Sequence, residues 1–330
     1  MSATSSEYRL GARRGLDACA SERGTFTVLA LDHRQNLRKA LHPDDPSATT
    51  YAEMVAFKRA VVRALAPVAT GTLLDPEVGA AQAIADGSLP AGAGLIVAIE
   101  ATGYEGPSTA RVSRVLDGWS VAAAKRMGAS AAKLLVYYHP QASNAADQEA
   151  LVARVAADCR ADDLALFVEP LSFSLVDGEK LAGEERRAVV IETARRLTAI
   201  GGDILKAEFP YDASVRDEGR WREACDELNE AARVPWVLLS GGVDDATFEA
   251  QVEVACDAGA SGVLAGRSVW EHAATLEPEA RDTFLATTGR ERLARLVDVV
   301  DRVGRSWREH PGALAGAREP GDGWYRDYAG

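Results

Sequence analysis

The sequence has few of the residues that form disulfide frameworks or metal sites. Its 330 residues include four cysteines and five histidines, and CxxC, HxH and HExxH spacings are absent. Scattered cysteines indicate free thiols in a reducing cytoplasm rather than a disulfide framework or a zinc site. We therefore expect a cytoplasmic protein that holds no metal.

Long apolar runs and excess positive charge are missing as well. No stretch approaches the ~20 apolar residues of a membrane span, and the start, MSATSSEYRLGARRG, lacks the apolar core of a signal peptide. The formal net charge is −12, which argues against partners such as nucleic acid or an anionic membrane surface. A local cationic pocket for a small anion stays compatible with this charge. The 47% of hydrophobic residues suffice for a sizeable core.

Eight short apolar runs alternate regularly with longer amphipathic segments. Near-continuous Val, Ile and Leu is typical of strands that are buried on both faces. Between two of the runs, Thr50 lies three residues before Glu53, which is the spacing of a capping box at a helix start. Eight strands, each followed by helical sequence, favour an α/β fold of the single-domain (β/α)8 TIM-barrel type. The predicted strands are 25–32, 70–76, 94–101, 131–138, 164–170, 204–210, 235–242 and 262–268.

The end of the chain departs from this alternation. Residues 291–307 predict an amphipathic helix, and 311–330 are rich in Gly and Pro. We assign residues 1–310 to the barrel, including this helix, and residues 311–330 to a tail. The aromatic residues of the tail leave two interpretations open: a mobile tail, or a segment that docks on the barrel mouth or on a neighbouring subunit.

Two lysines occur inside the apolar runs, Lys206 in ILKAEFP and Lys133 in AAKLLVYY. Lysine is among the residues least often fully buried unless it is paired. One ammonium beside another favours the neutral amine that Schiff-base chemistry needs. We therefore interpret Lys206 as a Schiff-base nucleophile and Lys133 as its neighbour and a contact for a substrate hydroxyl. The structural alternative is a set of core ion pairs, of Lys206 with Glu208 or Glu169 and of Lys133 with Asp32 or Glu169.

Polar side chains stand at the ends of most predicted strands. Because the chemistry of such barrels lies at the C-terminal ends of the strands, we expect these residues to meet around the lysines. Glu169 is the candidate proton-transfer group for imine formation, and Asp32 the candidate for a substrate hydroxyl. His33, Arg34 and Asp75 are further candidates for substrate contacts. The strand-end residues are Asp32, Asp75, Glu100, Glu169, Glu208, Ser240 and Arg267.

The last two predicted strands end in glycine-containing turns, LSGG and AGRS, each followed by helical sequence. Glycine lets backbone N–H groups approach an anion, and helix N-termini favour negative charge. Arg267 adds a guanidinium that can bind phosphate through two nitrogens. The loops after strands seven and eight are a recurrent phosphate site in TIM barrels. The two turns therefore predict a phosphate site, against the alternative of two ordinary glycine turns.

These segments resemble the class I aldolases of the bacterial tagatose 1,6-bisphosphate aldolase type and the related sulfofructosephosphate aldolases. The resemblance runs from about Ala30 to Trp270, and its most specific parts are Lys-x-Glu-x-Pro in the sixth predicted strand and Gly-Arg-x-x-Trp at the eighth. It implies a catalytic set of Lys206 as the Schiff-base lysine with Glu169, Lys133 and Asp32. It also implies a phosphate-binding set of Ser240, Gly241, Gly242, Gly266 and Arg267.

Two positions depart from the family pattern. His33 stands where these families usually have glutamine, and Ala101 where the bisphosphate aldolases usually have lysine. Both changes are expected to alter how the far end of the substrate is held.

The resemblance implies a ketose 1-phosphate aldolase that needs no cofactor. The candidate substrates are tagatose or fructose 1,6-bisphosphate and 6-deoxy-6-sulfofructose 1-phosphate, each cleaved reversibly to dihydroxyacetone phosphate and a three-carbon aldehyde. We expect a homo-oligomer, as is common for such barrels. Two alternatives stay open: a metal-dependent aldolase or isomerase that uses His33 and His139, and a non-catalytic regulator that senses sugar phosphates.

Overall fold

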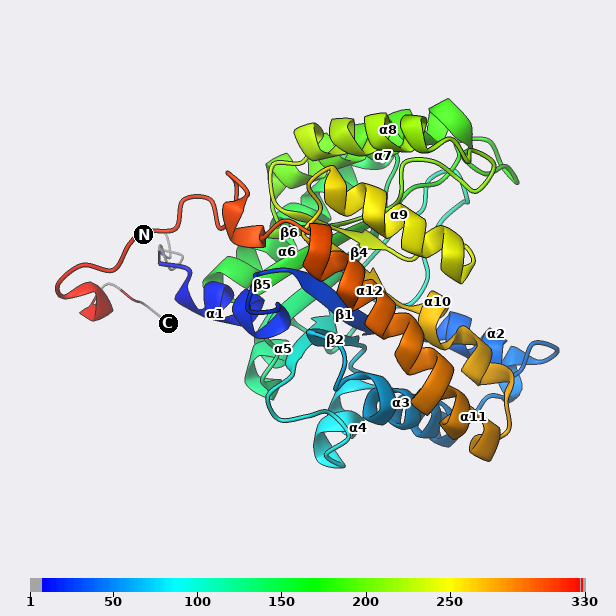
Figure 1. Ribbon diagram of the computed structural model, residues 1–330. Helices are drawn as coiled ribbons and strands as arrows, with labels where there is room; N and C mark the ends of the chain where they lie inside the picture. Colours follow the sequence, from blue (N-terminus) through cyan, green and yellow to red (C-terminus); the bar gives the residue numbers. More distant parts are fainter. Residues whose placement is uncertain (1–7, 327, 329–330) are drawn as a thin grey trace.

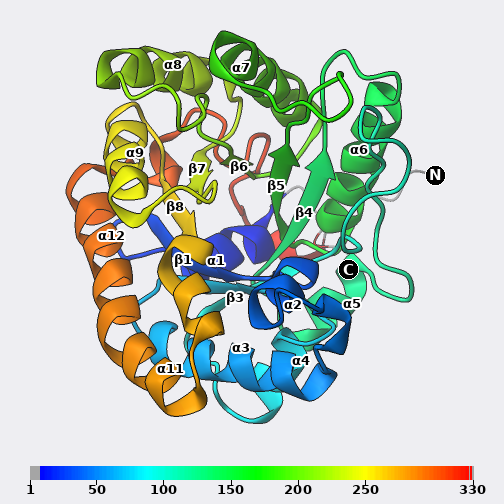
Figure 2. The same cartoon turned by 90° about the vertical axis from the view of Figure 1, so that its right-hand side faces the viewer.

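The strands close into one parallel barrel in a computed structural model that describes residues 8–326 and 328. Each strand pairs with the next in the sequence, and β8 pairs with β1. Figure 1 shows the barrel from the side, and Figure 2 shows the strands at the centre of a ring of helices. The predicted TIM barrel is confirmed. Its strands are β1 (Phe26–Leu31), β2 (Gly71–Leu74), β3 (Gly94–Ala98), β4 (Ala131–Tyr137), β5 (Ala165–Leu171), β6 (Ile204–Ala207), β7 (Trp236–Leu239) and β8 (Gly262–Ala265).

Helices follow every strand and cover the outside of the barrel. The predicted capping box is present: the side chain of Thr50 accepts the N–H of Glu53, and the Glu53 carboxylate accepts the N–H of Thr50. The amphipathic helix predicted at 291–307 forms α12 and ends at Val303. The helices are α1 (Leu10–Cys19), α2 (Gln35–Leu41), α3 (Tyr51–Leu65), α4 (Ala80–Ala85), α5 (Val121–Met127), α6 (Ala145–Ala161), α7 (Gly183–Ile200), α8 (Glu218–Ala231), α9 (Asp245–Asp257), α10 (Arg267–Trp270), α11 (Pro278–Phe284) and α12 (Arg290–Val303).

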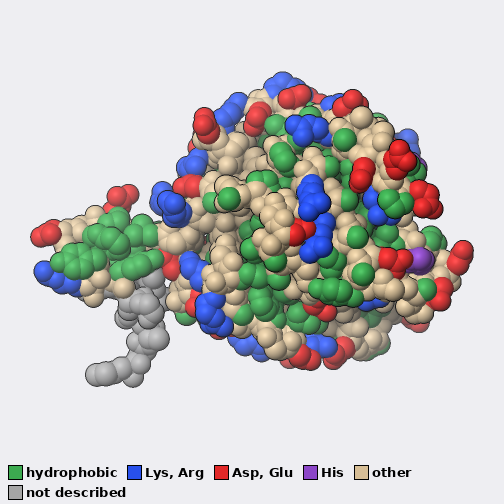
Figure 3. Space-filling model, turned by 90° about the horizontal axis from the view of Figure 1, so that it is seen from below, with side chains coloured by type: hydrophobic (Ala, Val, Ile, Leu, Met, Phe, Trp, Pro, Cys, Tyr) green, Lys and Arg blue, Asp and Glu red, His purple; other side chains and the backbone are tan. Residues whose placement is uncertain are grey.

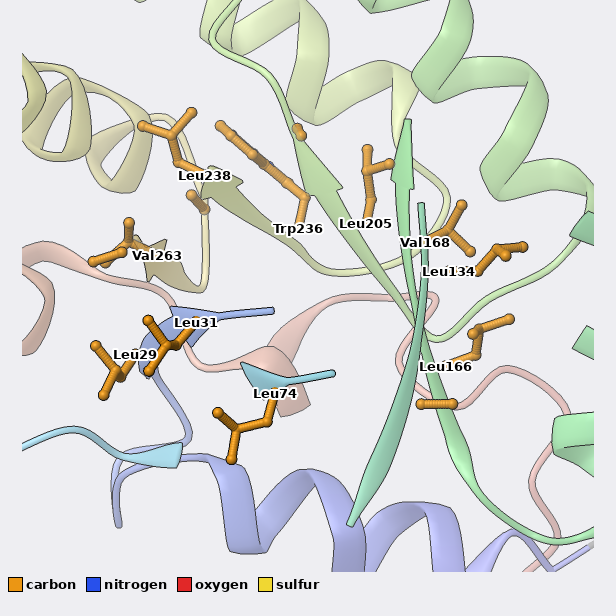
Figure 4. Close-up of a cluster of buried hydrophobic side chains, with 14 of the residues drawn as sticks. Leu29, Leu31, Leu74, Leu134, Leu166, Val168, Leu205, Trp236, Leu238 and Val263 are labelled. Atoms are coloured by element: carbon orange, nitrogen blue, oxygen red, sulfur yellow. The ribbon is translucent and has the colours of Figure 1, made fainter. Parts of the chain in front are cut away.

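Alternate side chains of the strands form two apolar layers. One layer packs against the helices and includes Leu29, Leu134 and Trp236 (Figure 4). The other layer fills the barrel and includes Ala131 and Ile204. Side chains two residues apart on a strand point to the same face. Lys133, two residues after Ala131, and Lys206, two residues after Ile204, therefore also point into the barrel, on the face that lines its interior.

The N-terminal end of the barrel is closed by α1, which the sequence analysis did not predict. Leu16 of this helix is fully buried against the layer that fills the barrel. Arg9, just before the helix, donates from Nη2 to both carboxylate oxygens of Asp203 at 2.9 and 2.8 Å. The carboxylate of Asp163 accepts the N–H of Gly11 at 2.6 Å. Together these contacts fix the helix across the barrel floor.

The C-terminal segment lies at this same end of the barrel, beside α1 (Figure 1). The rings of Trp324 and Tyr328 pack against Tyr8, with centroids 5.7 and 6.4 Å away. The Tyr328 hydroxyl donates to Asp163 at 2.6 Å. Figure 3 shows the segment as a projection that is rich in hydrophobic side chains. These aromatic residues therefore lie at the N-terminal end of the barrel. They do not dock on the barrel mouth, which is at the C-terminal end and which one interpretation of the sequence had proposed.

All four cysteines are free and buried. Across residues 8–326, no helix combines the length and the apolar character needed to cross a membrane.

Candidate active site

A cavity of about 300 Å³ opens at the C-terminal ends of the strands. Three of the predicted catalytic residues, Asp32, Glu169 and Lys206, line its wall. Lys133 is fully buried and contacts two of them from inside the barrel. The cavity brings most of the other predicted site residues together as well: His33, Arg34, Ser240, Gly241, Gly266 and Arg267.

Lys133 is the centre of a buried ion cluster. Its Nζ lies 2.6 Å from Oδ2 of Asp32, 2.5 Å from Oε1 of Glu100 and 3.1 Å from Oε2 of Glu169. Burial disfavours the ammonium, but the three carboxylates outweigh burial and raise the pKa of Lys133. Lys133 is therefore a fixed positive charge that gathers three carboxylates beside the cavity.

Lys206 shares one of these carboxylates. Its Nζ donates to Oε1 of Glu169 at 2.6 Å, while Oε2 of Glu169 faces Lys133. The repulsion expected between the two ammonium groups is thus offset by a carboxylate that contacts both. Of the core ion pairs of the structural alternative, those of Lys206 with Glu169 and of Lys133 with Asp32 and Glu169 are present, whereas Glu208 pairs with Arg186. Lys206 differs from an ordinary core lysine because it also borders a cavity.

Asp32 and His33 follow β1 and differ in charge. Burial disfavours the Asp32 carboxylate, but the ammonium groups of Lys133 and Lys206 outweigh burial and lower the pKa of Asp32 well below its ordinary value. Burial, aided by Lys206 and Arg267 and opposed by Asp32, lowers the pKa of His33 to about 4. Near neutral pH, Asp32 is therefore an ionised acceptor and His33 a neutral ring.

The turns after β7 and β8 contact each other at the cavity. The N–H of Gly266 donates to Oγ of Ser240 at 3.1 Å. Gly242 has a φ of 80°, and a Cβ there would lie 3.1 Å from Nη2 of Arg267, so both conformation and space favour glycine. Nε of Arg267 is buried and has no hydrogen-bond partner within the described residues. The guanidinium of Arg267 therefore has an unused hydrogen-bond donor at the part of the cavity where the sequence predicts a phosphate site.

Glu100, to which the sequence analysis gave no role, and Arg34, a predicted substrate contact, extend the ion cluster. Arg34 donates from Nη1 to Glu77 at 2.7 Å and from Nη2 to the main-chain oxygen of Glu100 at 3.0 Å. Oε2 of Glu100 accepts the N–H of Leu135 at 3.0 Å. The sequence signal for Glu100 was its place after β3 on the inward face, two residues beyond Ala98.

Besides Lys133, three predicted residues do not line the cavity: Gly242, which follows Gly241 of the lining, and Asp75 and His139. Asp75 is fully buried, pairs with Lys58 of α3 and accepts the N–H of Val78, which does not fit the predicted substrate contact. His139 is buried beside Phe173 and does not line the cavity. In the part of the chain that the structure describes, no three His, Cys, Asp or Glu side chains form a group that could hold a metal ion.

The fold and the site define a TIM-barrel enzyme with a lysine at its cavity wall. The chain belongs to the DeoC/LacD family of aldolases, whose family model matches residues 26–272, and the protein is an aldolase.

Individual relatives match nearly the whole chain. It is 30% identical to tagatose 1,6-diphosphate aldolase 2 of Streptococcus agalactiae, over 90% of this chain and 97% of the relative. It is 31% identical to tagatose 1,6-diphosphate aldolase of Streptococcus pneumoniae, over 89% of this chain and 96% of the relative.

Solved structures support the fold at lower identity. A Schiff base-forming fructose-1,6-bisphosphate aldolase matches with a TM-score of 0.58 and 22% identity, over 87% of this chain and 98% of that chain. The fructose-bisphosphate aldolase of Slackia heliotrinireducens matches with a TM-score of 0.60 and 15% identity, over 88% and 89%.

Proposed function

We propose that the protein is a class I aldolase that cleaves a ketose 1-phosphate reversibly to dihydroxyacetone phosphate and a three-carbon aldehyde. The observation that carries this proposal is the position of Lys206. Its amine borders the cavity and lies 2.6 Å from a carboxylate, Glu169, that also faces a second buried lysine. The names of the curated relatives, which are tagatose 1,6-diphosphate aldolases, support the same chemistry.

The ion cluster provides a way to make the amine nucleophilic. A Schiff base requires Lys206 in its neutral form. Glu169 is close enough to take the proton directly, and this transfer leaves the net charge of the cluster unchanged. Lys133 then stays paired with two carboxylates, Asp32 and Glu100. The amine can therefore be activated without leaving a buried charge unpaired.

The remaining steps follow from the same groups. The substrate phosphate binds at the turns 240–242 and 266–267, which brings the C2 carbonyl to Lys206. Glu169 returns a proton as the carbinolamine loses water, and the iminium draws electrons from the C3–C4 bond. Asp32, held ionised by the lysines, takes the C4 hydroxyl proton, and the aldehyde leaves. Protonation and hydrolysis of the enamine release dihydroxyacetone phosphate.

Tagatose 1,6-bisphosphate is the first substrate to test, because the relatives carry its name. Fructose 1,6-bisphosphate and 6-deoxy-6-sulfofructose 1-phosphate follow from the resemblance of the sequence. The cytoplasmic location and the homo-oligomer stay predictions.

A cleavage assay tests this function. Chelator-treated enzyme is incubated with each of the three ketoses, and dihydroxyacetone phosphate is measured through its reduction by a coupled dehydrogenase. We expect release from at least one ketose, at a rate that the chelator does not change. Activity that is lost with chelator and restored by a divalent ion would support the metal-dependent alternative. Binding without turnover of any ketose would support the regulatory one.

A further inference from the structure

We propose that Glu100 is a positioning residue of the reaction: it shares the ammonium of Lys133 so that Glu169 stays available to exchange a proton with Lys206. This inference rests on the proposed Schiff-base function. It assigns a task to a third carboxylate that the mechanism itself does not use.

Glu100 is held in place on several sides. It is 3% exposed, and its Oε1 accepts a hydrogen bond from Nζ of Lys133 at 2.5 Å. Its Oε2 accepts the N–H of Leu135 on the same strand as that lysine. Nη2 of Arg34 lies 3.5 Å from Oε1. A carboxylate with these partners is fixed against Lys133, which suits it to act through that lysine.

The distances around Lys133 divide the three carboxylates into two kinds. An ammonium has three N–H donors. Asp32 and Glu100 make the short contacts, at 2.6 and 2.5 Å, and Glu169 makes the long one, at 3.1 Å. Among the described residues, Oε2 of Glu169 makes no hydrogen bond, whereas its Oε1 bonds to Lys206. Glu169 is therefore the carboxylate that Lys133 binds least firmly.

Loss of the Glu100 charge would change this division. With one anion fewer, the ammonium of Lys133 would attract Glu169 more strongly and favour its carboxylate form. The negative charge of Glu100, which disfavours the carboxylate form of Glu169, would also be absent. Proton transfer from Glu169 would then be disfavoured. The dehydration step needs that proton, so the pH above which kcat falls would move down.

In Glu100→Gln, kcat is therefore expected to fall at a lower pH than in the wild-type enzyme. Loss of a charge this close moves the alkaline limb of kcat by about one pH unit. At a fixed pH on that limb, kcat of the variant would therefore be about tenfold lower than that of the wild type. KM would change less than kcat, because Glu100 acts through Lys133 rather than on the substrate phosphate. Glu100→Asp keeps the charge and should keep the position of the alkaline limb, even if kcat falls. Glu100→Ala provides a second neutral variant in case the amide disturbs folding.

Asp203 offers a matched control at the other end of the barrel. It too is a buried carboxylate that binds one buried cation, Arg9, and accepts one strand N–H, that of Leu166 at 2.9 Å. Asp203→Asn therefore measures the general cost of neutralising such a group. We expect it to lower stability without moving the pH profile.

The test measures kcat and KM from about pH 5 to 9 for the full-length enzyme and the variants, after folding is verified by circular dichroism. The inference is supported if the alkaline limb of kcat moves to lower pH in the neutral Glu100 variants alone. A limb that coincides with that of the wild type in a folded neutral variant overturns it, whether or not kcat is lower. A wild-type enzyme that traps no Schiff base with borohydride would instead overturn the proposed function.

Discussion

Both ends of the barrel are built around buried ion pairs, but at the C-terminal end these pairs line a cavity that the predicted catalytic residues share. At the N-terminal end, the Asp203 carboxylate accepts hydrogen bonds from the guanidinium of Arg9, the residue just before α1, and from the N–H of Leu166. At the C-terminal end, Lys206 is paired as well, but it borders open space. Nε of Arg267 is buried there without a hydrogen-bond partner in the described chain. Nε of Arg9 at the other end also has no hydrogen-bond partner among the described residues, so an unused donor does not distinguish the two ends. A buried ion pair therefore indicates a candidate site where it borders a cavity.

The comparison also shows why burial alone is a poor guide to function. Breaking a buried pair is costly at either end, because an uncompensated charge is left behind. The two ends should differ in what the loss affects: catalysis at one end and folding stability at the other. Paired substitutions at the two ends test this difference.

The largest effect is expected for Lys206→Met. Removal of the nucleophile abolishes the covalent route, so kcat should fall by at least about 10⁴-fold while the chain stays folded. The measurement is ketose cleavage, with circular dichroism as the check on folding. Substantial activity that remains in the folded variant would show that the reaction does not pass through this amine.

The matching change at the other end is Arg9→Met. It leaves the carboxylate of Asp203 buried without its cation, so the free energy of unfolding should fall by about 3–5 kcal/mol. The activity per folded molecule should stay unchanged. Urea unfolding with an activity assay on the folded fraction checks both statements. A cost below about 1 kcal/mol, as for exposed pairs, would mean that this pair does not fasten α1.

Arg267→Ala should have an intermediate effect. The loss of a charged hydrogen bond to the substrate phosphate is worth about 1.5–3 kcal/mol, so KM should rise roughly 10- to 100-fold with little change in kcat. Arg302→Ala on α12 is the control, since that side chain is 57% exposed and pairs with Glu253. An unchanged KM in Arg267→Ala would remove the phosphate site from this wall.

The smallest effect is expected for Tyr328→Phe. It removes the hydrogen bond to Asp163, and with it about 0.5–1.5 kcal/mol of stability. Tyr325→Phe serves as the control, because Tyr325 is 60% exposed. Thermal unfolding distinguishes the two. Equal stability of both variants would favour the mobile tail of the sequence analysis over the docked segment.

Much of the fold could be predicted from the sequence, because strands buried on both faces leave uninterrupted apolar runs. The capping box at Thr50 was equally local and equally predictable. Helix α1 was missed because its apolar face has a partner only once the barrel has closed. The two strand lysines could be identified from the sequence because a charged residue inside an apolar run is unusual.

The parts of the site that were missed depend on contacts between distant segments. Glu100 meets Lys133 because β3 and β4 pair in the register that sets Ala98 beside that lysine. Asp75 was interpreted as a substrate contact, although Lys58, a residue of the helix outside the barrel, takes its carboxylate. Neither partner can be read from spacing along the chain, because register and helix orientation are fixed only by tertiary packing.

Borohydride trapping tests the central claim most directly. The full-length enzyme is incubated with dihydroxyacetone phosphate, reduced with borohydride and mapped by mass spectrometry, with Lys206→Met treated in parallel. The account predicts a covalent adduct on Lys206 in the wild type and none in the variant. An adduct on a different lysine, or no adduct in the folded wild-type protein, would contradict it.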